Sequence, residues 1–169
     1  MKWPQFKNYY TNIFCFFVNF YWPIFKKIKQ SGTLFFNDLD LFANEIKNKS
    51  IKLIGITGSN GKTTVASLIK YLLDQYQVNA QLVGNIGTPI LDIVDELNND
   101  FIVMEASSFQ LELGATLHFD IGVILNITED HMDRYDTFKD YIEAKFNLFK
   151  RSKIKIINYD DPEIGRAHV

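Results

Sequence analysis

The 169-residue sequence contains a single cysteine, Cys15, so no disulfide can form within the chain. A reducing compartment, the cytoplasm, is the simplest setting for such a chain. The formal net charge is only −2, which gives no indication of a surface for nucleic acid or another polyanion. No internal repeat and no low-complexity segment is present, and the length suits one domain with a substantial core.

A long apolar run is also lacking. Residues 9–25 are rich in aromatic side chains, but they are too few to cross a bilayer, and Asn12, Asn19 and Pro23 interrupt them. The segment has no small-residue cleavage site of the kind that ends a signal peptide. We therefore expect neither export nor membrane attachment, and interpret residues 1–21 as a truncated or out-of-frame start. Residues 163–169 (EIGRAHV) are interpreted as a non-native tail and left out of the fold prediction.

The most informative segment present is residues 57–64, TGSNGKTT, between an apolar run and an amphipathic pattern that begins at Lys62. A glycine-rich turn that leaves a strand and opens a helix is typical of a phosphate-binding loop. Backbone N–H groups and the positive helix end face the anion, the lysine reaches the outer phosphates, and a hydroxyl holds Mg²⁺. The strict motif has glycine where this chain has Ile56. The segment predicts a variant P-loop, and a solvated turn is the alternative.

Strand and helix patterns alternate along the rest of the chain. Strands are predicted at residues 51–57, 80–83, 101–104, 121–127 and 154–158, and two of these are the continuous apolar runs of buried parallel strands. Helices are predicted from Lys62 to about Tyr76, from Pro89 to about Leu97, and from a cap at Thr137 to about Phe149. This alternation predicts an α/β fold with a parallel sheet and right-handed crossovers. Ligands in such sheets gather at the carboxyl ends of the strands.

The first of these helices is expected to bury one apolar stripe against the sheet. The stripe consists of Val65, Leu68, Ile69, Leu72, Leu73 and Tyr76. The polar segment at residues 107–112 (SSFQLE) is expected to be a substrate-facing loop.

Three further residues carry candidate chemistry. Glu105 follows a buried strand, where an acid commonly supports Mg²⁺ near phosphates, although it could instead cap a helix. His131 follows the next strand and could bind a metal or position a phosphate, or be an ordinary surface histidine. Lys145 interrupts the apolar stripe of the last helix, so it must snorkel to solvent, pair with an acid or serve a site. That stripe consists of Phe138, Tyr141, Ile142, Phe146 and Phe149.

Four motifs together resemble the Mur ligase family, in the order in which that family carries them. They are residues 58–64 (GSNGKTT), 84–87 (GNIG), 105–112 (EASSFQLE) and 126–134 (NITEDHMDR). The resemblance covers residues 24–162, and SSFQLE with GNIGTP favours the branch that adds D-glutamate.

This resemblance implies an ATP-dependent ligase that activates the carboxylate of UDP-N-acetylmuramoyl-L-alanine as an acyl phosphate and joins it to D-glutamate. Lys62 would hold the outer phosphates, Thr63 and Glu105 one Mg²⁺, and His131 a second. Lys145 matches a carbamylated lysine that serves the second metal. The nucleotide loop would comprise Gly58, Ser59, Asn60, Gly61, Lys62, Thr63 and Thr64, and the UDP-linked substrate would contact Asn85 and Ser107.

The resemblance also implies a division of the chain. Residues 22–50 match a remnant of an amino-terminal domain that binds the UDP end, and residues 51–162 match part of the central ATP-binding domain. A carboxyl-terminal domain that binds D-glutamate has no counterpart, so this chain is expected to be an inactive fragment of a protein that is monomeric at full length. A folate-glutamating ligase of the same type and a non-catalytic nucleotide-binding switch remain as alternatives.

Overall fold

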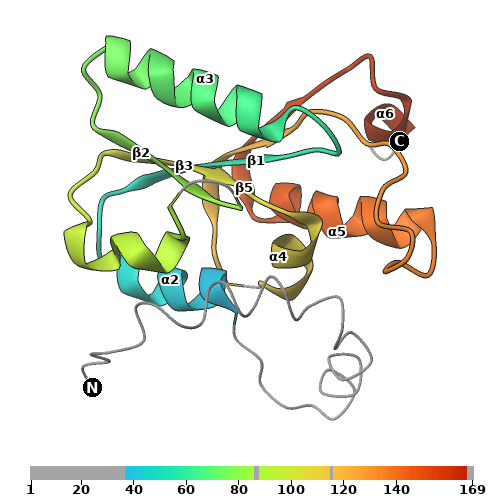
Figure 1. Ribbon diagram of the computed structural model, residues 1–169, viewed down its shortest axis with the longest axis horizontal. Helices are drawn as coiled ribbons and strands as arrows, with labels where there is room; N and C mark the ends of the chain where they lie inside the picture. The colour runs from blue at the N-terminus through green and yellow to red at the C-terminus, as the bar shows by residue number, and fades with distance from the viewer. Residues whose placement is uncertain (1–36, 86–87, 115, 167–169) are drawn as a thin grey trace.

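The computed structural model describes residues 37–85, 88–114 and 116–166 (Figure 1). Helices and strands alternate along this part of the chain. In order they are α2 (Asp38–Ile46), β1 (Lys52–Thr57), α3 (Lys62–Gln75), β2 (Ala80–Gly84), the 3-10 helix η1 (Ile90–Glu96), β3 (Phe101–Glu105), α4 (Ser108–Leu113), β4 (Phe119–Ile124), α5 (Phe138–Lys150), β5 (Ser152–Ile157) and α6 (Pro162–Arg166).

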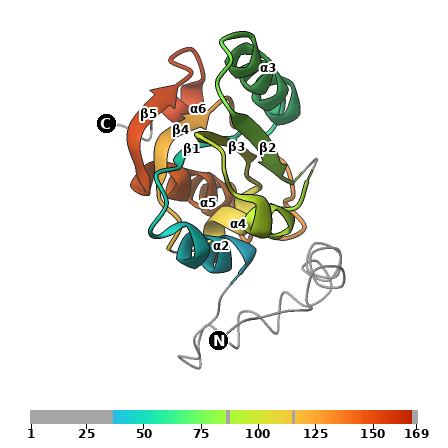
Figure 2. The ribbon, with the colours of Figure 1, turned by 90° about the vertical axis from the view of Figure 1, so that its left-hand side faces the viewer.

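The five strands form one sheet in the order β2-β3-β1-β4-β5, and every neighbouring pair is parallel. Helix α3 lies on one face, whereas α2, η1, α4 and α5 lie on the other (Figures 1 and 2). The prediction of a parallel α/β sheet with flanking helices is confirmed. No helix in the described ranges is long and apolar enough to span a membrane.

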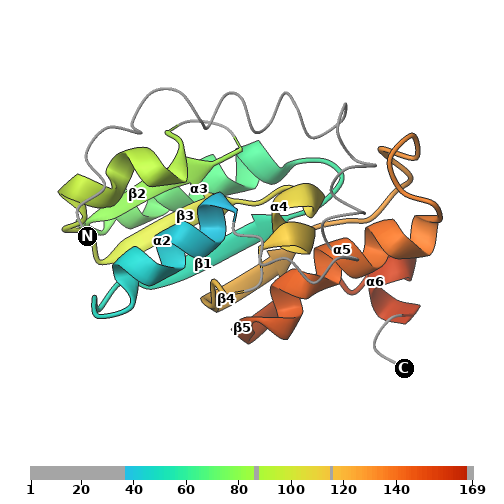
Figure 3. The same cartoon turned by 90° about the horizontal axis from the view of Figure 1, so that it is seen from below.

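The two faces bury different amounts of apolar side chain. The larger cluster lies under α2, η1, α4 and α5 and includes Phe42, Phe119 and Leu148, which are almost fully buried. The smaller cluster lies under α3 and is centred on Ile56, Ala66 and Val103. Figure 3 shows the larger face, with α2, α4 and α5 side by side across the strands.

The predicted stripe of α3 is only half right. Val65, Ile69 and Leu73 pack partly buried against the sheet. The prediction is wrong for the other half, because Leu68 and Leu72 are about half exposed and Tyr76 is 81% exposed. A single helix contacts a sheet along a narrow line, so the six side chains of the predicted stripe cannot all reach the sheet.

Residues 107–112 were expected to form a loop, and this prediction is wrong. They begin α4, and Ser107 is its N-cap in a capping box with Gln110. The helix predicted after Pro89 is a 3-10 helix, and the strand predicted at residues 121–127 runs instead from Phe119 to Ile124. Thr137 caps α5 as predicted, with a capping box to Asp140.

Both ends of the described chain contribute to the core. Leu39 and Phe42 of α2 are fully buried in the larger cluster. Residues 163–169 were left out of the predicted fold, yet Ile164 of α6 is fully buried in the same cluster. The aromatic segment at residues 9–25, the expected start at residues 1–21 and positions 86–87 of the predicted loop lie outside the described residues.

Candidate functional site

The polar residues singled out by the sequence lie at the carboxyl ends of the strands. Ile56 of β1 and Gly84 of β2 both stand in register with Glu105 at the end of β3. Gly84 has φ +120°, and a Cβ there would lie 2.2 Å from the Glu105 carbonyl oxygen, so only glycine fits. The strand ends thereby form one continuous edge, as the rule for parallel sheets requires.

The loop between β1 and α3 is held by the segment that follows β4. Ser59 N–H donates to the Asn126 carbonyl oxygen at 3.0 Å, and Asn60 N–H donates to Asn126 Oδ1 at 2.8 Å. Asn126 Nδ2 in turn donates a hydrogen bond to the Asn60 carbonyl oxygen at 3.0 Å. Gly61, at φ +79°, precedes α3 and gives it no side-chain cap. The N–H groups of the first turn of α3 therefore remain available to an anion.

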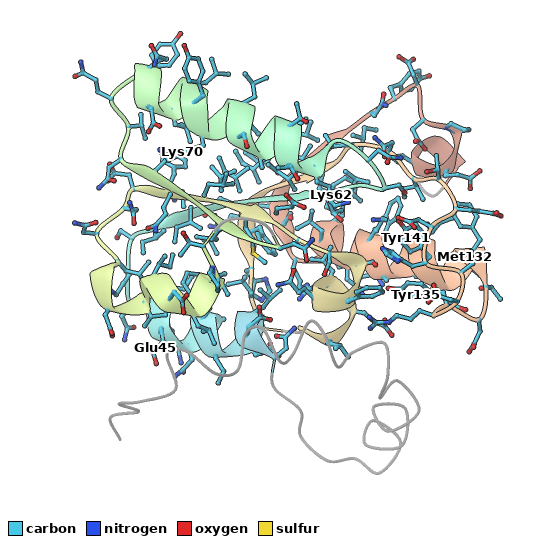
Figure 4. All side chains as sticks on the ribbon, in the orientation of Figure 1. Glu45, Lys62, Lys70, Met132, Tyr135 and Tyr141 are labelled. Atoms are coloured by element: carbon cyan, nitrogen blue, oxygen red, sulfur yellow. The ribbon has the colours of Figure 1, made fainter. Side chains whose placement is uncertain are left out.

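Two lysines from opposite faces of the sheet meet at this loop. Lys62 Nζ, from α3, donates to the Gly58 carbonyl oxygen at 2.8 Å and to the Ser59 carbonyl oxygen at 3.0 Å. Lys145 Nζ, from α5, donates to the same Gly58 oxygen at 2.9 Å. Figure 4 shows Lys62 at the end of α3 nearest to Tyr141, which lies on α5. Two amines therefore lie at one carbonyl oxygen. A polyphosphate bound here would compete with that oxygen for both amines.

Lys145 lies on the inward face of α5, as its place in the apolar stripe predicted. The residue is only 2% exposed. Burial, and next the nearby charge of Lys62, lower the pKa of the Lys145 amine to about 7, while Asp130 acts in the opposite direction. A substantial share of this amine is thus neutral near pH 7, and a neutral amine is a nucleophile.

Thr63 and Glu105 come together as the sequence predicted. Thr63 Oγ1 donates to Glu105 Oε2 at 2.8 Å, and Glu105 is 2% exposed. In the described part of the chain, no three His, Cys, Asp or Glu side chains gather into a metal site. Mg²⁺ commonly takes one or two carboxylates and completes its shell with phosphate and water oxygens. A single carboxylate beside a hydroxyl at a phosphate loop fits that chemistry.

His131 lies apart from this pair. It is an exposed residue with φ +57°, and its ring stacks at a tilt on Phe109, with 5.0 Å between centroids. Its Nε2 lies 3.6 Å from Asp130 Oδ2. The hydrogen bonds and ring contacts described for His131 do not include the other predicted metal ligands. A role for His131 at a second metal therefore stays a prediction.

Asn85 and Ser107 occupy the same edge of the sheet. Asn85 is exposed just after β2, and its N–H donates to the Glu105 carbonyl oxygen at 3.0 Å. The Ser107 hydroxyl accepts from Gln110 N–H and lies 3.2 Å from Gln110 Oε1, so the capping box already uses it. Their proposed contact with a substrate stays a prediction.

Sequence reasoning missed two residues that shape the site. Asn126 was read only as part of a motif, although its side chain holds the phosphate loop. Tyr141 was assigned to the apolar stripe, although its hydroxyl lies 3.0 Å from Ser59 Oγ. A tyrosine one helical turn before the buried Lys145 was the available signal, since a buried hydroxyl needs a partner.

Comparison with known proteins gives one consistent family. Residues 56–168 match the model of the Mur ligase middle domain. The chain is 42% identical over 144 residues to UDP-N-acetylmuramoylalanine–D-glutamate ligase of Coxiella burnetii, which covers 85% of this chain and 32% of the relative. It is 45% identical over 139 residues to the enzyme of the same name from Shewanella oneidensis, covering 82% and 31%. The chain thus spans about a third of the length of the curated relatives it matches.

Solved structures agree on the fold. A UDP-N-acetylmuramoyl-L-alanyl-D-glutamate–2,6-diaminopimelate ligase superposes with a TM-score of 0.63 at 28% identity, covering 76% of this chain and 31% of that one. A MurF ligase from Thermotoga maritima in complex with ADP gives a TM-score of 0.62 at 23% identity, covering 76% and 33%.

Proposed function

This chain belongs to the Mur ligase family, and on that premise we propose that it is part of an ATP-dependent ligase that adds D-glutamate to UDP-N-acetylmuramoyl-L-alanine. Such a ligase supplies a precursor of peptidoglycan and works in the cytoplasm. Residues 51–162 form part of its ATP-binding domain, and residues 22–50 belong to the domain that binds the UDP end. We propose that the full-length protein is a monomer that binds neither nucleic acid nor membrane.

The reaction has two steps. The terminal carboxylate of UDP-N-acetylmuramoyl-L-alanine attacks the γ-phosphorus of ATP, the bond to the bridging oxygen breaks, and ADP leaves. The D-glutamate amine then attacks the acyl carbon, an amide bond forms, and inorganic phosphate leaves as the amine loses its proton. These steps ask the protein chiefly for alignment and for neutralisation of phosphate charge.

The observation that carries this proposal is the convergence of Lys62 and Lys145 on the Gly58 carbonyl oxygen beside the Thr63–Glu105 pair. Lys62 would exchange its bonds to the carbonyl oxygens of Gly58 and Ser59 for bonds to the outer phosphates of ATP. Thr63 and Glu105 are the residues that would hold Mg²⁺, and the ion would offset part of the phosphate charge. Residues 58–64 supply the backbone cradle.

Lys145 is proposed to act as a carbamate. Its neutral amine attacks carbon dioxide, an N–C bond forms and a proton is lost, which leaves an anion on the side chain. Burial supplies the neutral amine that this reaction needs, because it disfavours the ammonium form. The carbamate would serve a second Mg²⁺ together with His131, and Asn85 and Ser107 would contact the UDP-linked substrate.

The first test is nucleotide binding by this chain. Lys62→Met should weaken the affinity for a fluorescent ATP analogue with Mg²⁺ by at least about tenfold, because a charge-assisted bond to phosphate is lost. Lys70→Met is the matched control, since Lys70 lies on the same helix and pairs with Asp74. Equal affinities for both variants would contradict a nucleotide role for the loop.

The second test uses the full-length protein. Phosphate release should require both UDP-N-acetylmuramoyl-L-alanine and D-glutamate. Equal turnover with unrelated amino acids would favour a sibling ligase, and nucleotide binding without turnover would favour a switch.

A further inference from the structure

Tyr141 joins α5 to the phosphate loop. It is 1% exposed on α5, and its Oη lies 3.0 Å from Ser59 Oγ. Ser59 Oγ also donates to the Thr128 carbonyl oxygen and accepts from Thr128 N–H, both at 2.9 Å. A serine hydroxyl has one hydrogen and two lone pairs. Because the hydrogen goes to Thr128, Tyr141 is the donor to Ser59, and every hydrogen-bonding position of the serine is used.

The ring of Tyr141 contacts a second residue, Lys145. Lys145 follows one turn later on α5, and its Nζ lies 4.5 Å from the centroid of the Tyr141 ring. The ring is itself held by an edge-to-face contact with Tyr135, at 5.3 Å between centroids, and by Phe138, at 6.2 Å. One rigid side chain thus touches the loop through its hydroxyl and the buried lysine through its face.

Both contacts act on the same peptide unit. Ser59 provides the N–H side of the Gly58–Ser59 peptide, and the Gly58 carbonyl oxygen accepts Lys145 at 2.9 Å. The Ser59 N–H is fixed separately by the Asn126 carbonyl oxygen. Burial raises the pKa of the Tyr141 hydroxyl, so it stays a donor at neutral pH.

We propose that Tyr141 is a positioning residue that fixes the Gly58–Ser59 peptide, through Ser59 with its hydroxyl and, while the Lys145 amine is unmodified, through Lys145 with its ring. The inference rests on the proposed use of this loop as a nucleotide-phosphate site. It assigns to Tyr141 no contact with the nucleotide or with the reacting atoms.

A double-mutant cycle tests the hydroxyl. Tyr141→Phe keeps the ring and removes the donor, and Ser59→Ala removes the acceptor. Affinity for the fluorescent ATP analogue with Mg²⁺ should fall about fivefold for Tyr141→Phe in the natural background, the usual loss for one buried hydrogen bond. In the Ser59→Ala background the same change should weaken the affinity by less than about twofold, because the hydrogen bond between the two hydroxyls is already absent. Additive losses would overturn the proposal.

Hydrogen exchange gives a readout that needs no nucleotide. The Thr128 amide, which donates to Ser59 Oγ, should exchange about five times faster in Tyr141→Phe. Phe146→Leu is the control, because Phe146 lies on the same helix and its described ring contact is with Phe149 rather than with Tyr141. Its Thr128 amide should keep the natural rate. Unchanged exchange in Tyr141→Phe, or equal acceleration in both variants, would overturn the proposal. Absence of nucleotide binding by the natural chain would instead refute the proposed function and leave the exchange result decisive for Tyr141.

Native-state methylation of Lys145, followed by mass spectrometry, tests the ring. The amine should be protected in the natural chain and in Tyr141→Phe, and should label about ten times faster in Tyr141→Leu, because the ring no longer covers it. Equal labelling rates in the Tyr141→Phe and Tyr141→Leu variants would show that the ring does not position Lys145.

Discussion

The two faces of the sheet differ in how they are covered, and the difference separates stability from ligand handling. Helical elements α2, η1, α4 and α5 pack on the face that carries Phe119, whereas α3 covers the face that carries Ile56 and Val103. On the α3 side, Ile154 and Ile156 of β5 remain 57% and 48% exposed. Each face still sends one lysine to the loop. The densely packed face provides the buried amine of Lys145, and the sparsely packed face provides the partly buried amine of Lys62.

The largest expected effect compares the packing of the two faces. Leu148→Ala removes a fully buried side chain of α5 and should lower the free energy of unfolding by about 3 kcal/mol, the usual loss for a leucine that leaves a cavity. Leu72→Ala makes the same change on α3, where the side chain is 46% exposed, and should cost less than about 1 kcal/mol. Urea unfolding followed by circular dichroism measures both. Similar losses would show that α3 is covered in solution.

The fold was predictable wherever a sequence pattern was compatible with only one local structure. Lys145 was placed correctly on the inward face because a charged residue interrupted an otherwise apolar stripe. Helix α4 was missed because six residues are too few for periodicity, although Ser107 and Gln110 form a readable capping box. The division of the α3 stripe could not be predicted, since Leu68 and Ile69 are equally apolar and only the position of the sheet decides which one is covered.

The site was predictable in its members but not in its connections. Thr63 and Glu105 meet because loops at the carboxyl ends of parallel strands converge, which the strand order implies. Tyr141 and Asn126 were missed because their partners lie more than sixty residues away in the sequence. No local pattern encodes such hydrogen bonds, and only the packed structure brings them together.

The second prediction compares the two lysines. The folded-state pKa of Lys145, about 7, lies below its ordinary value of 10.5. Between these values the unfolded chain binds more protons than the folded chain, so the free energy of unfolding should rise with pH from about 7 upward. Lys145→Met should remove this slope and should raise stability near pH 7 by about 2 kcal/mol, since a desolvated charge is replaced by an apolar side chain of similar length.

Urea unfolding at pH 7, 8 and 9 measures this slope, below the range in which tyrosines ionise. Lys62→Met is the comparison: because the charge of Lys62 helps to lower the pKa of Lys145, its loss should move the onset of the slope to higher pH but should not abolish it. The Gly58 carbonyl oxygen keeps one amine in either variant. A slope that survives Lys145→Met would assign the pH dependence to another group.

The smallest expected effect lies on the exposed part of the α3 face. Ile156 of β5 is in register with Val123 of β4, so the two side chains point to the same side of the sheet. Ile156→Thr should change the free energy of unfolding by less than about 0.5 kcal/mol, because the side chain is already half in water and threonine suits a strand. Val123→Thr, at a site 8% exposed, should cost about 1–2 kcal/mol through burial of the hydroxyl. Light scattering during concentration should also fall for Ile156→Thr, because the β5 edge offers less apolar surface for association. If Ile156→Thr lowers the free energy of unfolding as much as Val123→Thr does, this part of the face is covered. The two faces would then differ only in the number of helices packed on them.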